Sequence, residues 1–117
     1  MTAARFVFLV VGEDGTSHEH HARLRTGSVD QVLRRAVGGW PEPLPISLPG
    51  LSAWCDEQGR LTGRRPNPVG SLLVARLGGP VTPLVGPIAV TGRRGAALTG
   101  LDAGQIDTLL AVLAGCR

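Results

Sequence analysis

Apolar residues in the first 40 positions recur at strand spacing and then at helical spacing. The β-branched run near the N-terminus and the Glu-Asp-Gly turn after it predict a β-hairpin. The helical spacing begins after Ser28 and Gln31, which stand in capping-box spacing, and two consecutive glycines end it. The elements expected here are strands over 4–12 and 18–24 and a helix over 29–37.

Prolines and glycines divide the middle of the chain. The proline-rich stretch 40–50 predicts an edge strand or an extended connection, because each proline lacks the N–H that a central ladder needs. Asn67 and Pro68 suit the N-cap and first residue of a helix. The other elements expected here are a strand over 51–57, a turn at 58–59, a short strand over 60–63, a helix over 68–77, a buried strand over 84–92 and a turn over 92–96.

A last helix is predicted near the C-terminus, where Asp102 and Gln105 repeat the capping-box spacing. Its apolar stripe is expected to lie buried on the sheet and consists of Ile106, Leu109, Leu110 and Leu113. The order of elements predicts one α+β domain over residues 1–117, a small mixed or antiparallel sheet with about three helices packed mainly on one face.

Composition narrows the class of protein. The 117 residues suit one domain, and 43% apolar content excludes a disordered chain. Aromatic residues make up only 3%, so the core must be built from Leu, Val, Ala and Ile. All 12 basic residues are arginine, which is typical of GC-rich bacterial genomes. The net charge of +3 is compatible with an acidic partner without requiring one.

The cysteines and apolar runs indicate a cytoplasmic protein. Cys55 and Cys116 do not form a disulfide framework, and we interpret them as free thiols of a reducing compartment. Whether the two cysteines form a disulfide with each other is left open, because pairing depends on Cα positions that a sequence does not give. The run at 5–11 is too short for a signal sequence, and no later apolar run is long enough to span a membrane.

Two groups of residues could in principle support metal binding or catalysis. The three histidines all lie in the run 18–21, where His18 and His20 would share one strand face, but no second ligand pair follows elsewhere. A nucleophilic Cys55 would need a lowered thiol pKa, whereas its neighbours Asp56 and Glu57 raise it. We therefore assign no catalytic residue, no metal site and no cofactor.

Several short motifs resemble a known family when taken in order. They are "VGGW" (37–40), "CDEQGRLTGRRPN" (55–67), "GPIAVTG" (86–92) and "LTGLDAGQI" (98–106). Over about residues 27–110 they resemble the DUF3846-type domain of unknown function, carried by phages, plasmids and actinobacterial chromosomes. The resemblance implies an actinobacterial or mobile-element setting. It supplies no activity, so no functional residue is carried over.

Four positions of the second motif are interpreted as a structural loop. A buried thiol packs like a small hydrophobic residue, a glycine suits a hairpin turn that needs positive φ, and an asparagine can cap a helix or tie its loop. These structural positions are Cys55, Gly59, Gly63 and Asn67.

Two arginine doublets form the candidate binding site. Arg64-Arg65 and Arg93-Arg94 each follow a Thr-Gly pair that ends a predicted strand. If these strands are neighbours that run the same way, four guanidinium groups gather at one end of the sheet and suit phosphate or carboxylate. The alternative is that frequent arginine codons produced the repeat. A third doublet, Arg34-Arg35, is interpreted as part of a solvated helix face.

We therefore expect a small, non-enzymatic binding or regulatory accessory protein. Its partner is expected to be a protein rather than nucleic acid or a membrane, since few aromatic residues are present to stack on bases. One alternative is an accessory protein that binds nucleic acid or another anion through the arginine doublets. A second alternative is a minor enzyme or metal protein. The sequence does not indicate an oligomeric state.

Overall fold

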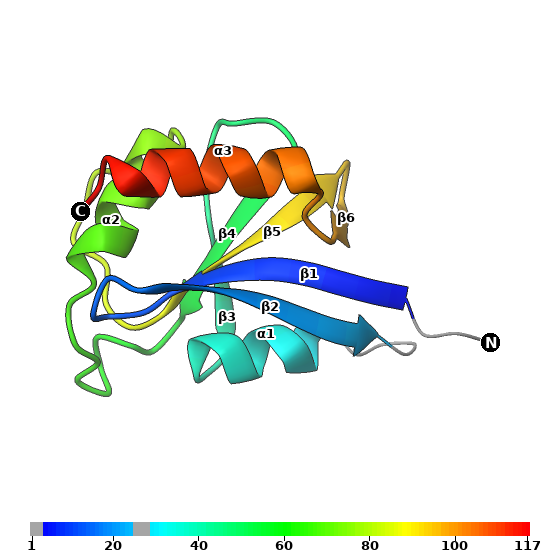
Figure 1. Ribbon diagram of the computed structural model, residues 1–117. Coiled ribbons are helices and arrows are strands. Elements are labelled where there is room, and N and C mark those ends of the chain that lie inside the picture. The colour runs from blue at the N-terminus through cyan, green and yellow to red at the C-terminus, as the bar shows by residue number, and fades with distance from the viewer. Residues whose placement is uncertain (1–3, 25–28) are drawn as a thin grey trace.

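The computed structural model describes residues 4–24 and 29–117, and its elements form an α+β fold, as the sequence predicted (Figure 1). The Ser28 end of the expected capping box lies outside the described residues. The elements are β1 (Ala4–Val11), β2 (Ser17–Leu24), α1 (Val29–Val37), β3 (Pro41–Leu44), β4 (Leu51–Asp56), α2 (Pro68–Arg76), β5 (Ile88–Arg94), β6 (Ala97–Thr99) and α3 (Ala103–Ala114).

One antiparallel sheet organises the described chain. Its strand order is β2-β1-β5-β4-β3, and β6 also pairs with β5. The proline-rich segment supplies β3 at the edge of the sheet, where the prolines Pro41 and Pro43 do not interrupt a central ladder. The hydrophobic strand β5 lies between β1 and β4 and is buried through Gly92.

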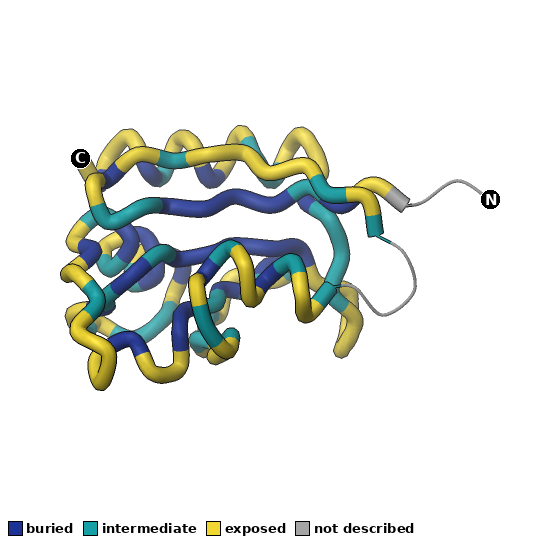
Figure 2. The backbone as a smooth tube through the Cα atoms, turned by 90° about the horizontal axis from the view of Figure 1, so that it is seen from below, coloured by how far each residue is buried: buried dark blue, intermediate teal, exposed yellow. Residues whose placement is uncertain are grey.

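The helices cover both faces of the sheet. Successive residues of β1 point to opposite faces, so Leu9 and Val11 pack toward α2 and α3, while Phe8 and Val10 pack toward α1. Figure 1 shows α2 and α3 on one side of the sheet and α1 on the other. Two of the three helices thus share a face, and α1 covers the opposite one. Figure 2 shows the buried residues concentrated between these layers.

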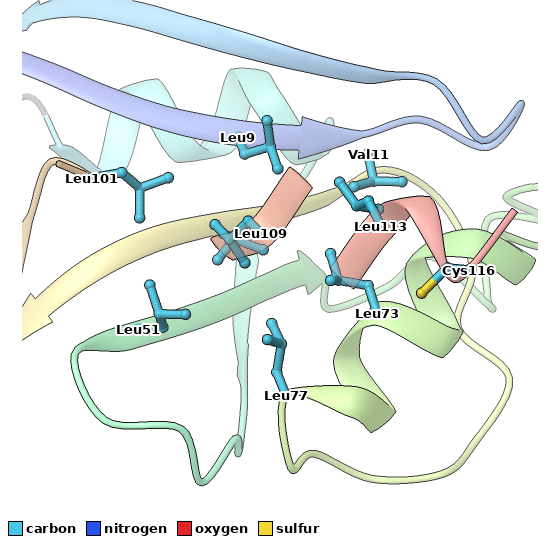
Figure 3. Packing of buried hydrophobic residues seen from close by; sticks show 10 residues of the cluster. Leu9, Val11, Leu51, Leu73, Leu77, Leu101, Leu109, Leu113 and Cys116 are labelled. Carbon is cyan, nitrogen blue, oxygen red and sulfur yellow. The ribbon is translucent and has the colours of Figure 1, made fainter. Parts of the chain in front are cut away.

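The larger core cluster joins the sheet to α2 and α3 (Figure 3). Leu109 and Leu113, one helical turn apart, are both buried in it, and Ile106 packs against it. The expectation that Leu110 is also buried was wrong: this side chain is 43% exposed. Each helical residue turns about 100°, so Leu110 lies beside the buried stripe rather than within it.

The structure differs from the sequence-based prediction at two hairpins. Residues 60–63, expected as a strand, form turns after β4. The turn expected over 92–96 is confined to Gly95 and Ala96, because β5 continues to Arg94 before the chain turns back into β6. Gly95 makes that turn possible with a φ of 60°. The three residues of β6 were too few to show a strand period.

Candidate functional site

The motif at 55–67 and the glycines after α1 form one structural unit. The buried carboxylate of Asp56 accepts a hydrogen bond from the Arg64 Nε at 3.3 Å and another from the Gln58 amide at 3.0 Å. Arg64 also donates to the main-chain carbonyl of Gly38. Gly38 has a φ of 78°, and a Cβ at Gly38 or Gly39 would collide with Arg64 or Asp56, respectively. Both glycines are therefore required for this packing.

The two arginine doublets do not gather at one end of the sheet. Arg64 and Arg65 follow β4, whereas Arg93 and Arg94 end β5, and these two strands are antiparallel. The predicted juxtaposition was wrong because residues 60–63 form no parallel strand. Arg64 is committed to Asp56 and Gly38, while Arg65, Arg93 and Arg94 are exposed and make no side-chain hydrogen bond or ion pair with described residues. Anion binding by those three residues stays a prediction.

The other loop positions are explained by packing and backbone geometry. Cys55 is buried, and burial together with the nearby Glu42 carboxylate raises the pKa of its thiol to about 11. Gly59 does not adopt the positive φ expected for it; a Cβ there would instead press on Val85 at 3.0 Å. Gly63 does adopt a positive φ, of 74°, in open space.

Asn67 is fully buried and fixes the start of α2. Its Oδ1 accepts from the Gly70 amide at 2.9 Å, which confirms the predicted N-cap. Its Nδ2 donates to the carbonyls of Val11 and Gly86 at 3.0 and 2.8 Å. One side chain thereby joins β1, α2 and the segment that leads into β5.

The histidines and the α1 arginines are engaged in local contacts. The ring of His20 packs 5.1 Å from that of Phe8, and His21 accepts a hydrogen bond from Arg5. The described residues contain no group of three potential metal ligands. Arg34 lies 3.9 Å above the ring of Trp40, and with Arg35 it sits in the last turn of α1, where the helix dipole favours cations.

An apolar groove that the sequence-based reasoning missed lies between α2 and residues 80–84. Its volume is about 410 Å³. The groove is lined by Pro66, Asn67, Pro68, Ser71, Leu72, Ala75, Val81, Thr82, Pro83 and Leu84.

Three hydrogen bonds hold the walls of this groove. The Ser71 hydroxyl accepts from the Leu84 amide at 2.8 Å and donates to the Asn67 carbonyl, while the Asn67 amide donates to the Leu84 carbonyl at 2.9 Å. Leu72 is nevertheless 46% exposed and Val81 is 90% exposed. The groove is therefore a fixed apolar surface that faces solvent.

Comparison with known proteins identifies the family. The family model described as a domain of unknown function (DUF3846) matches residues 8–114. The chain belongs to this family. No curated protein and no solved structure gives a significant match to the DUF3846 chain. No helix in the described part of this DUF3846 domain is long and apolar enough to cross a membrane.

Two sequence signals could have revealed the groove in this DUF3846 domain. Helix α2 carries apolar residues on all sides, which is unusual for a helix with one solvent-facing side. In addition, residues 58–101 contain six arginines and no Asp or Glu. One of these, Arg60, lies at the rim, where it donates to the Pro83 carbonyl at 2.6 Å. The groove is thus apolar inside, and the Arg60 cation lies at its rim.

Proposed function

We propose that this DUF3846 domain is a non-enzymatic, cytoplasmic binding module whose α2 groove receives a segment of another protein. The observation that carries the proposal is the solvent-facing apolar groove between α2 and residues 80–84. Leu72 and Val81 expose apolar surface that gains free energy when a partner covers it. The all-arginine basic composition supports an actinobacterial or mobile-element origin.

The lining favours a protein segment over a small molecule. Small-molecule sites combine apolar walls with a few free polar groups that orient the ligand. Here the Asn67 amide group and the Ser71 hydroxyl are already bonded within the protein, and no charged side chain lines the groove. Among the described lining residues, the Thr82 hydroxyl is the one polar side-chain group without a bonded partner. An apolar segment needs only shape and burial, which this surface offers.

Charge defines the rest of the occupant. The stretch 60–84, which contains the whole groove, holds four arginines and no acid, and one of the four, Arg64, is paired with Asp56. Arg60 is fixed at the rim through Pro83, and Arg65 directly precedes the lining residue Pro66. A segment with apolar residues flanked by Asp or Glu complements both the groove and its rim.

A non-enzymatic role is supported by the state of the candidate reactive groups. The raised pKa of Cys55 keeps its thiol protonated near neutral pH, and a thiol rather than a thiolate is a poor nucleophile. The nearest described partner of its sulfur is the carboxylate of Glu42, at 3.8 Å, rather than an imidazole. An active cysteine nucleophile needs a neighbour that favours the thiolate, such as an imidazolium, whereas the Glu42 carboxylate disfavours it.

The experiment is a selection from a random library of displayed 12-residue peptides, followed by affinity measurements on the enriched sequences. We expect enrichment of apolar residues beside Asp or Glu. Binding should be lost in Leu72→Asp and Val81→Asp and retained in Leu110→Asp, a matched change at an exposed leucine outside the groove. Equal binding by all three variants, or no enriched peptide, would contradict the proposal.

The nucleic-acid alternative is separated from this proposal by its salt dependence. Binding through the exposed arginines to duplex DNA lowers the logarithm of affinity with the logarithm of salt, with a slope of roughly −0.9 per phosphate contact. It should also be insensitive to Leu72→Asp beyond the effect of one added charge. Tight, steeply salt-dependent DNA binding with no peptide binding would favour the alternative.

A further inference from the structure

A second concave site lies beside the β5–β6 hairpin, and it differs in chemistry from the α2 groove. Its volume is about 470 Å³. Because β3 pairs with β4 only from Ala53 onward, the first residues of β4 are not covered by β3, and the pocket opens beside them. The pocket is lined by Pro43, Leu44, Pro45, Ile46, Leu51, Ser52, Ala53, Trp54, Arg93, Gly95, Ala96 and Leu98.

Arg93 gives this pocket one uncompensated positive charge. No acidic residue lines the pocket, and the Arg93 side chain has no hydrogen-bond or ion-pair partner in residues 4–24 and 29–117. Its main chain is fixed, because the Arg93 amide donates to the Gly50 carbonyl at 2.8 Å and the residue pairs with Leu98 on β6. Adjacent strand residues point to opposite faces, so Arg94 is directed away from this side.

Trp54 supplies a fixed, flat apolar wall. Its indole Nε1 donates to the Thr91 hydroxyl at 3.1 Å, which holds the ring in one orientation. Trp54 and Leu98 both pack against the cluster under α1, which places them on the same face of the sheet. The prolines 43 and 45 add rigid apolar wall without free N–H groups.

We propose that this pocket binds a small organic anion with a planar apolar body, of the aromatic carboxylate class. The guanidinium of Arg93 holds the carboxylate through charge-assisted, two-pronged hydrogen bonds. The apolar body packs against Trp54, Leu98 and the prolines, where offset stacking on the indole adds to the burial of apolar area. The site is independent of the protein segment proposed for the α2 groove, because the two share no lining residue.

The test uses the full chain with Trp40→Phe, which leaves Trp54 as its single tryptophan. The probes are naphthalene-2-carboxylate, its neutral carboxamide and inorganic phosphate, each titrated while the Trp54 indole N–H resonance is followed. We expect a saturable shift with the carboxylate. The carboxamide lacks the charge-assisted bonds, so its affinity should be weaker by a factor of about ten or more. Arg93→Gln should weaken carboxylate binding to the level of the carboxamide.

Arg94→Gln is the matched control, since it removes the same charge from the neighbouring residue outside the pocket. It should leave the affinity for the carboxylate unchanged. Unchanged melting temperatures in both arginine variants show that the comparison concerns folded protein. The proposal is overturned by equal binding of acid and amide, by equal loss in both variants, or by no saturable shift of the indole resonance. A response of the Arg93 amide to phosphate alone, without a Trp54 shift for the carboxylate, overturns it as well.

Discussion

The guanidinium of Arg64 donates to the buried carboxylate of Asp56 at 3.3 Å and, on its other side, to the carbonyl of Gly38. This relationship joins the end of β4 to the end of α1. It also separates the members of one arginine doublet, because Arg65 makes no such contact in the described structure and is exposed. Arg64 therefore contributes to the fold, and of these two residues only Arg65 remains available for a partner.

Arg64→Gln should lower the free energy of unfolding by about 1–3 kcal/mol, since it leaves the Asp56 carboxylate buried without its charge partner. The loss stays below that of a fully buried pair because the Arg64 side chain is 30% exposed. Arg65→Gln, which removes the same charge from the neighbouring residue, should change the free energy of unfolding by no more than about 0.5 kcal/mol. Urea unfolding of both variants measures the difference; equal effects would contradict the structural role of Arg64.

Asn67→Ala should destabilise the protein by about 2–4 kcal/mol, because it removes the N-cap of α2 and leaves the buried carbonyls of Val11 and Gly86 without their donor. Asn67→Asp keeps the capping oxygen but has no N–H to donate. We therefore expect the aspartate variant to be destabilised too, as measured by chemical unfolding. Wild-type stability in the aspartate variant would show that the cap alone matters.

Leu109→Ala should cost about 2–5 kcal/mol, because this side chain is fully buried in the cluster between α3, α2 and the sheet. Leu110→Ala, the same change one residue later, should cost less than about 1 kcal/mol because the side chain is 43% exposed. Thermal and urea unfolding provide both values. Similar losses in the two variants would mean that α3 is rotated relative to the arrangement described above.

Stability should decline in alkali through Cys55. Burial, followed by the Glu42 carboxylate, raises the pKa of this thiol from 9.0 to about 11, so between these values the unfolded chain loses a proton that the folded chain keeps. The free energy of unfolding should thus fall as pH rises through this range. The Cys55→Ala variant should show a shallower decline, in urea unfolding from pH 8 to 11. Iodoacetamide should label Cys55 at pH 8 only after denaturation, and rapid labelling of the native protein would argue against its burial.

Local patterns in the sequence were sufficient to predict most of the helices and strands. Asn67 and Asp102 are helix caps because their short side chains bond to amides only three residues away, an interaction that the local sequence specifies completely. The prolines of β3 likewise restricted that strand to an edge through their own missing N–H groups. The turn residues after β4 were misread because the four residues 60–63, Arg-Leu-Thr-Gly, are too few to distinguish a strand from a turn.

The relationships that define the candidate sites depended on the tertiary structure. Whether Arg64 is near Arg93 is determined by the antiparallel direction of β4 and β5, and no pattern within either motif encodes that direction. The hydrogen bond from the Asn67 side chain to the Val11 carbonyl joins residues that are 56 positions apart in the sequence. The groove beside α2 exists only because the segment ending at Leu84 returns to that helix. A sequence determines the local hydrogen bonds and the apolar faces, whereas long-range packing decides which charges remain free and which apolar surface stays uncovered.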